Sequence, residues 1–226
     1  MDAKRDVLPV TQQSCQESAW VLGCAFVDEP VSLAIYKKYS PEKRLRNLTA
    51  DFAAELEGCI RYGCPLQIWD EGKVVAAAVI YHPGSYPLPW IEQARISIKS
   101  IIGHDYYDLR PWLRWLAEID KIHPREPHYY LEYLGVAPEY QGRGFGSTIL
   151  QTLTAKADEE NTGCYLETAS PRNVPLYQRH GFKVFAEKHI IGLKSWFMWR
   201  PARGRAHDPA GQARAGIAGE IEASLK

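Results

Sequence analysis

The apolar positions of the N-terminal part change from strand-like to helical spacing. We predict a short strand near residues 7–10 and a helix over 11–26 that Pro30 ends. Ser40 and Pro41 supply an N-cap and a first helical residue. The apolar stripe behind them recurs every three or four residues, which predicts a second, long helix. Its members are Leu45, Leu48, Phe52, Leu56 and Ile60.

The middle of the chain combines a hairpin pattern with a breaker-rich loop. Apolar runs at 66–69 and 74–81 flank a turn that contains glycine, as antiparallel strands joined by a tight turn require. The segment 82–89, rich in Pro and Gly, predicts a loop. Two helical stretches follow over 90–119, divided near 103–105.

A strand, a glycine-rich run and a helix follow one another in the C-terminal half. The apolar segment 128–136 predicts a strand, and residues 141–146 contain three glycines. The residues that then share one helical face are Phe145, Ile149, Leu153 and Ala157. A further strand at 164–168, a short helix at 172–179 and two strand-like stretches at 182–187 and 195–199 complete the predicted sheet.

Length and composition limit the classes of protein. The chain has 226 residues, of which 46% are hydrophobic, enough for one large domain over 1–200. Residues 201–226, rich in Ala, Gly and Arg, predict a flexible tail with at most one helical turn at 220–225. With 27 acidic and 27 basic residues the net charge is zero, so no overall field favours nucleic acid or an anionic membrane. We therefore expect the partner to be a small molecule.

The five cysteines form no Cys-x-x-Cys pair, so we predict no metal site and reduced thiols in the cytoplasm. For Cys59 and Cys64 we favour simple packing as small apolar side chains. The alternative is a disulfide between them. The N-terminal segment lacks the apolar run of a secretory signal, and no segment approaches the ~20 apolar residues that cross a bilayer. We expect a monomer or a homodimer.

The glycine-rich run has the chemistry of an anion site. Glycines allow tight turns and close approach of a ligand, and the first amides of a helix have no acceptor within it. Together with its flanks, the run resembles motif A of the GNAT acyl-CoA transferases. The matching segment is Leu134-Gly135-Val136-Ala137-Pro138-Glu139-Tyr140-Gln141-Gly142-Arg143-Gly144-Phe145-Gly146. Gln141, Gly144 and Gly146 match the three defining positions of the pattern Gln/Arg-x-x-Gly-x-Gly/Ala.

A second stretch resembles motif B of the same family: Leu166-Glu167-Thr168-Ala169-Ser170-Pro171-Arg172-Asn173-Val174-Pro175-Leu176-Tyr177-Gln178-Arg179-His180-Gly181-Phe182. Its residue pattern is most similar to that of the puromycin N-acetyltransferase branch. The resemblance implies an α/β (α+β) fold with a mixed, mostly antiparallel sheet of six to seven strands, splayed in the middle and flanked by helices. It also implies an N-acetyltransferase that uses acetyl-CoA.

By the resemblance, the pyrophosphate of acetyl-CoA meets the glycine-rich run and its pantetheine arm pairs with the preceding strand. The implied binding residues are Leu134, Gly135, Val136, Gln141, Gly142, Arg143, Gly144, Phe145, Gly146, Ser147, Asn173 and Tyr177. Backbone amides and the charge of Arg143 suit the phosphates.

Acyl transfer to an amine needs a base, an oxyanion donor and an acid. Tyr177 matches the tyrosine that in many family members protonates the departing sulfur. Glu167 matches a family position where a carboxylate often acts through water. Glu132 is a second candidate base, because strand alternation puts it on the face of Leu134. We expect the oxyanion donor to be a backbone amide near Leu134.

The acceptor pocket is expected in the aromatic N-terminal part. The candidate aromatic residues are Trp69, Tyr81, Tyr86, Trp90, Tyr106, Tyr107, Trp112 and Trp115. Such rings can line a pocket for a flat or cationic amine, although most of them can equally form core. The alternatives to a small-molecule N-acetyltransferase are a non-catalytic acyl-CoA-binding module and a protein or peptide N-acetyltransferase.

Overall fold

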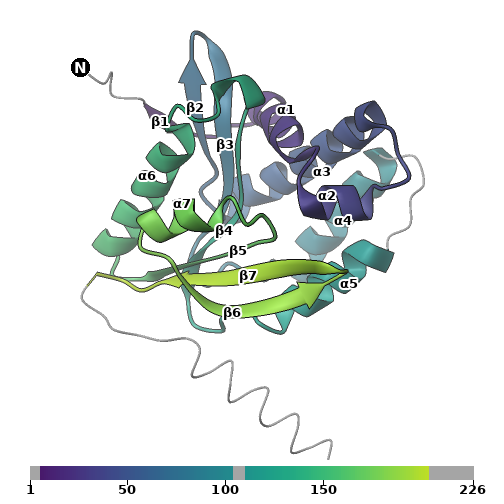
Figure 1. Cartoon of the computed structure of the whole chain (residues 1–226). Helices are drawn as coiled ribbons and strands as arrows, with labels where there is room; N and C mark the ends of the chain where they lie inside the picture. The colour runs from purple at the N-terminus through teal and green to yellow at the C-terminus, as the bar shows by residue number, and fades with distance from the viewer. Residues whose placement is uncertain (1–5, 104–109, 204–226) are drawn as a thin grey trace, which may run out of the picture.

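The protein's structure, a computed structural model, describes residues 6–103 and 110–203. Its centre is a seven-stranded sheet of order β1-β2-β3-β4-β5-β7-β6, with helices on both faces (Figure 1). The strands are β1 (Val7–Pro9), β2 (Leu66–Asp70), β3 (Lys73–Tyr81), β4 (His128–Val136), β5 (Gly163–Thr168), β6 (Lys183–Ile190) and β7 (Leu193–Arg200). Neighbouring strands are antiparallel except β4 and β5. This confirms the predicted mixed, mostly antiparallel sheet.

The helices are α1 (Cys15–Phe26), α2 (Pro30–Ile35), α3 (Pro41–Tyr62), α4 (Trp90–Gly103), α5 (Arg110–Asp120), α6 (Phe145–Glu159) and α7 (Val174–Arg179), with a 3₁₀ turn η1 (Pro138–Tyr140). Helix α3 forms as predicted. Ser40 Oγ accepts a hydrogen bond of 3.3 Å from the Lys43 amide, and Pro41 is its first residue. The predicted hairpin is confirmed as β2 and β3, joined by Glu71 and Gly72 with φ of 48° and 78°.

The first helix and the role of Pro30 differ from prediction. Helix α1 begins at Cys15, because residues 11–14 form a turn in which the Thr11 amide donates to Ser14 Oγ at 3.0 Å. Pro30 does not simply end that helix; it is the first residue of α2, where its missing N–H costs nothing.

The two faces of the sheet carry separate cores. Helix α6 covers one face with its predicted apolar side, whose residues Phe145, Ile149, Leu153 and Ala157 are all buried. Helices α1 and α3 cover the other face, where Leu22, Phe52 and Leu56 are buried. The site described below lies on the α3 side.

Several expectations concern residues outside 6–103 and 110–203. The tail from 204 onward, the helical turn at 220–225, and Tyr106 and Tyr107 lie outside the described residues.

The five cysteines are free thiols, so Cys59 and Cys64 form no disulfide. Within the described segments no helix combines the length and apolar character that a bilayer crossing needs.

Candidate active site

Strands β4 and β5 separate in the middle of the sheet. They pair over three residues only, the last pair being Tyr130 and Tyr165. Beyond that pair, β4 runs on to Val136 beside β3, whereas β5 continues beside β7. Within residues 6–103 and 110–203, no strand therefore neighbours residues 131–136 on the β5 side, where an extended ligand with amide groups can pair like an added strand.

A β-bulge lies directly after the separation point. Val79 pairs with Tyr133 and Ile80 with Leu131, so Glu132 is an extra residue on β4. Tyr133 packs edge-on against Phe52 of α3, while Leu134 packs in the opposite, α6-side core. The expectation that Glu132 and Leu134 share a face is wrong, because the bulge interrupts the alternation and turns Glu132 toward α3.

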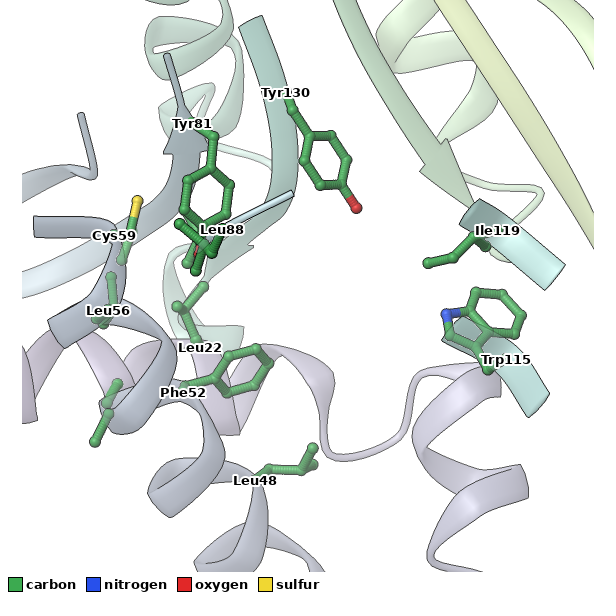
Figure 2. Close-up of a cluster of buried hydrophobic side chains, with 14 of the residues drawn as sticks. Leu22, Leu48, Phe52, Leu56, Cys59, Tyr81, Leu88, Trp115, Ile119 and Tyr130 are labelled. Carbon is green, nitrogen blue, oxygen red and sulfur yellow. The ribbon is translucent and has the colours of Figure 1, made fainter. Parts of the chain in front are cut away.

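A cavity of about 530 Å³ opens beside the separated strands. Figure 2 shows Leu48, Phe52 and Tyr130 facing Trp115 and Ile119, and all five line the cavity. Further walls come from α2, α4, the 86–88 segment and α7. The cavity is thus built from elements that are far apart in the sequence.

The predicted aromatic set divides between the cavity, the core and the surface. Tyr86, Trp112 and Trp115 line the cavity. Tyr81 is fully buried next to it, whereas Trp69 is exposed and Trp90 is 77% exposed. Of the 82–89 loop, it is therefore the part at Tyr86 to Leu88 that borders the cavity.

Glu167 lies on β5 just past the separation point and lines the cavity. Its Oε1 accepts a hydrogen bond of 2.6 Å from the Tyr130 hydroxyl, and its buried Oε2 has no hydrogen-bond partner among the described residues. Burial raises the pKa of Glu167 to about 7, against the opposing effects of the Tyr130 and Tyr165 hydroxyls. The carboxyl can therefore both accept and release a proton near neutral pH.

Glu132 faces a second carboxyl, that of Glu55 on α3. Burial, and then the charges of Glu55 and Glu167, raise the pKa of Glu132 well above its usual range. Burial also raises the pKa of Glu55, which accepts a hydrogen bond from the Tyr81 hydroxyl. Glu55 and Glu132 are close enough to share a proton.

Sequence reasoning missed Glu55. The available signal was its position on α3, three residues after Phe52 and directly before Leu56, where a carboxyl borders the apolar stripe. An acidic residue at such a position is placed against the core, and needs a partner or a proton there.

Helix α7 brings Asn173 and Tyr177 to the cavity wall. Asn173 is the N-cap residue of α7, but its side chain makes no capping hydrogen bond. Tyr177 is 7% exposed and packs edge-on against Phe182. Burial, followed by the charges of Glu29 and Glu167, raises the pKa of Tyr177, so its hydroxyl keeps its proton at neutral pH.

The glycine-rich run joins β4 to α6 through two left-handed glycines. Gly142 has φ of 76°, and Gly144, the N-cap of α6, has φ of 89°. Gln141 Nε2 donates to the Val136 carbonyl at 3.1 Å and so ties the loop to the end of β4. Arg143 Nη2 donates to the Glu139 carbonyl at 2.9 Å, which directs the guanidinium back along the loop.

The other predicted binding positions flank this turn. Phe145, the first residue of α6, has a buried side chain. Gly146 and Ser147 lie in the same first turn, whose amides face outward. A Cβ on Gly146 would come no closer than 3.7 Å to Val136. Gly135 has a packing role, because a Cβ there would lie 2.9 Å from Ala25 of α1.

Comparison with known proteins decides the family. Residues 32–182, more than half of the chain, match the model of the acetyltransferase (GNAT) family. The chain belongs to the GNAT family. This GNAT protein is also 33% identical over 191 residues to an uncharacterised N-acetyltransferase of Schizosaccharomyces pombe, covering 80% of this chain and 74% of the relative. It is an acetyl-CoA-dependent acyltransferase.

Solved structures share the fold. One described as histone acetyltransferase HPA2 and related acetyltransferase, from Corynebacterium glutamicum, has a TM-score of 0.67 at 25% identity over 91% of this chain and 100% of that one. A polyamine N-acetyltransferase of Drosophila melanogaster has a TM-score of 0.57 at 15% identity, over 88% and 100% of the chains. The second likeness concerns the fold alone.

Two features of the backbone near the cavity are open to a ligand. The first turn of α6 offers outward amides and the positive end of a helix dipole, an arrangement that suits an anion. The one-sided edge of β4 at 131–136 suits an extended ligand with amide groups. The cavity with Glu167 and Tyr177 begins where that edge begins.

Proposed function

We propose that this GNAT enzyme transfers the acetyl group of acetyl-CoA to a primary amine of a small molecule, which attacks directly while both substrates are bound. The observation that carries the proposal is the cavity beside the separated strands, which holds Glu167 with a pKa of about 7 and Tyr177 on its wall. Walls from α2, α3, α4 and α5 surround it, which favours a small acceptor. The residues of the two motifs are most similar to those of the puromycin N-acetyltransferase branch, which supports the same choice.

The donor would be held by the C-terminal half of the domain. The amides from Arg143 to Ser147 would bind the pyrophosphate, with Arg143 adding its charge. The edge of β4 at Leu134 and Val136 would pair with the pantetheine arm, and Asn173 would offer its uncapped side chain to the same arm. Bound acetyl-CoA supplies an activated acyl thioester.

Glu167 would prepare the acceptor. An amine is an ammonium ion near neutral pH and must lose a proton before it can attack. A carboxyl with a pKa of about 7 accepts that proton more readily than an ordinary one. Glu132, which lies across the separation point, would be the alternative base, although its proton is shared with Glu55.

Tyr177 would supply the proton that the departing sulfur needs. Its hydroxyl carries a proton at neutral pH, but burial and two carboxyl groups raise its pKa and make it a weaker acid, so the local field at the departing sulfur has to assist the transfer. Its position on the first turns of α7 puts it on the cavity wall beside Asn173. A backbone amide near Leu134 would stabilise the oxyanion.

A thiol-release assay tests the proposal. The purified protein, with acetyl-CoA, is presented with alkylamines, aromatic amines, polyamines, puromycin and short peptides. Release of CoA with at least one small amine, and acetylation of that amine seen by mass spectrometry, is expected. Acetylation of peptides alone would point to a protein acceptor, and binding of acetyl-CoA without any transfer would point to a non-catalytic module.

A further inference from the structure

Two tyrosine hydroxyls act on the Glu167 carboxyl. Tyr130 of β4 and Tyr165 of β5 form the last pair before the strands separate, so their side chains lie on the same face of the sheet. The Tyr130 hydroxyl donates to Glu167 Oε1 at 2.6 Å, and the Tyr165 hydroxyl also lowers the pKa of that carboxyl. Both hydroxyls favour the charged form of Glu167. Its affinity for a proton therefore depends on where the two rings point.

The imidazole of His123 packs against both of these rings. Its centroid lies 4.8 Å from that of Tyr130 and 4.6 Å from that of Tyr165, with interplanar angles of 89° and 73°. The two tyrosine centroids are 5.5 Å apart, so the three rings are in mutual contact. Tyr86 packs on the same imidazole at 4.7 Å. One side chain thus restricts the movement of three tyrosine rings.

His123 is anchored next to the cavity without being part of its wall. It follows α5, and its amide donates to the Ile119 carbonyl at 2.9 Å. Its side chain is buried and is not among the described residues that line the cavity, whereas Tyr86 and Tyr130 are. An effect of His123 on the reaction therefore has to pass through the tyrosines.

The imidazole acts by contact and not by charge. Burial, followed by the charges of His128 and Arg125, lowers the pKa of His123 to about 3, so the ring is neutral near neutral pH. Its buried Nε2 has no hydrogen-bond partner among the described residues. An unpartnered buried nitrogen lowers stability. Packing against the tyrosines is what this side chain contributes in return.

The other titratable groups that face Glu167 keep their protons near neutral pH. Burial raises the pKa of each tyrosine among them, and Glu132 shares a proton with Glu55. A change in ring position therefore acts on Glu167 through hydrogen bonds from hydroxyls. The groups are Tyr86, Tyr130, Glu132, Tyr133, Tyr165 and Tyr177.

We propose that His123 is a positioning residue for the base, because its imidazole holds the rings of Tyr130 and Tyr165 with their hydroxyls directed at Glu167. The inference rests on the proposed function, in which Glu167 takes the proton of the amine. A hydrogen bond weakens steeply when its donor tilts or moves away. Space beside the two rings would loosen both contacts with the carboxylate, and Glu167 would then bind its proton more tightly.

His123→Ala tests the inference because it opens that space. We expect the acidic limb of kcat/KM to shift upward by about half a pH unit or more, since the carboxylate loses hydrogen bonds. His123→Phe keeps a flat ring in contact with the tyrosines and should leave the limb within about 0.2 pH unit of the wild type.

His82→Ala is the matched control. The His82 ring packs on Tyr129, at 5.8 Å, and Tyr129 belongs to the core on the opposite face of the sheet. This variant loses an imidazole from a tyrosine of the same strand, away from Glu167, so its limb should not move. A shift as large as that of His123→Ala would show a general effect of destabilisation and would overturn the inference.

A second background shows whether the effect passes through the tyrosines. The Tyr130→Phe/Tyr165→Phe protein lacks both hydroxyls, so His123→Ala should move its limb no further. NMR titration of the Glu167 carboxyl carbon, assigned with Glu167→Gln, follows the same pKa without turnover. If the protein acetylates no amine, the proposed function fails, whereas this titration still decides the role of His123.

Three results would overturn the inference. They are an unmoved Glu167 pKa in folded His123→Ala, an equal shift in His123→Phe, and a further shift in the protein without the two hydroxyls. His123→Leu, which also lacks a flat ring, replaces His123→Ala if the alanine variant unfolds below the assay temperature. It should shift the limb in the same direction, and an unmoved limb in this variant would overturn the inference equally.

Discussion

The hydroxyl of Tyr130, which belongs to the last pair between β4 and β5, donates a 2.6 Å hydrogen bond to Oε1 of Glu167, two residues beyond that pair on β5. This bond favours the charged carboxylate, whereas burial favours the neutral acid. The two effects leave the pKa of Glu167 at about 7. The separation of the strands thus creates both the opening for a ligand and a group that exchanges protons at neutral pH.

Removal of that hydrogen bond should move the pH dependence of the reaction. Tyr130→Phe takes away a donor that lowers the pKa of Glu167, so the pKa rises and the acidic limb of kcat/KM shifts upward by about one pH unit. Steady-state rates between pH 5.5 and 9 measure the shift. Tyr129→Phe removes a hydroxyl bonded to Glu160, away from the cavity, and should leave the limb in place. An unmoved limb in Tyr130→Phe would argue against Glu167 as the base.

Glu167 should lower stability while it serves activity. An acid whose pKa rises from 4.5 to about 7 on folding favours the folded state only when protonated, so stability falls as pH rises through that interval. At pH 8 the cost is up to about 3 kcal/mol, from 1.36 kcal/mol per unit of pKa. Glu167→Gln keeps an acceptor for Tyr130 without this cost.

The Glu167→Gln variant is therefore expected to melt about 5 °C or more above the wild type at pH 8. At pH 4.5 the two proteins should melt within about 2 °C of each other, because the wild-type carboxyl is then largely protonated when folded. Its kcat/KM should drop by about 100-fold or more. Equal melting temperatures at both pH values would show that the carboxyl is not destabilised by burial.

Tyr177 should matter for turnover much more than for binding. Tyr177→Phe keeps the ring and its edge-on contact with Phe182, but removes the proton donor. We expect kcat to decrease by about 100-fold and the KM for acetyl-CoA to change by less than about threefold. Single-turnover rates, with acetyl-CoA affinity measured separately, distinguish the two. A variant with normal kcat would leave the sulfur to be protonated by another group.

The conformation of the loop before α6 should determine donor affinity. Gly144 has φ of 89°, which an alanine adopts only with strain of about 1–2 kcal/mol, so Gly144→Ala should displace the loop amides. We expect the KM for acetyl-CoA to rise about tenfold. Gly192→Ala imposes comparable strain at φ of 85° in the β6–β7 turn, and should lower stability without changing that KM. Parallel changes in both variants would mean that the loop has no specific role.

The elements that would form the donor half of the site could be predicted because they are consecutive in the sequence. Strand β4, the left-handed Gly144 and helix α6 follow one another, and each has its own local signal in glycine placement or apolar spacing. Asn173 and Tyr177 likewise belong to a single short segment. Local patterns of this kind are preserved when the chain folds.

The acceptor half could not be predicted in the same way. Glu132 changes face because β3 and β4 pair with a register shift, and register depends on both strands at once. Glu55 joins Glu132 from a helix more than seventy residues away in the sequence. Pro30 shows that even a local signal can be ambiguous, because a proline can end one helix or begin the next.

The one-sided pairing of β4 also has a consequence outside catalysis. An unpaired strand edge is a template for the extended chain of another molecule, and proteins usually cover or charge such edges to avoid aggregation. Along residues 131–136 the pantetheine arm would provide that cover. We therefore expect the enzyme to stay dispersed on warming when saturated with acetyl-CoA and to precipitate without it, so that the bound substrate protects the enzyme from aggregation.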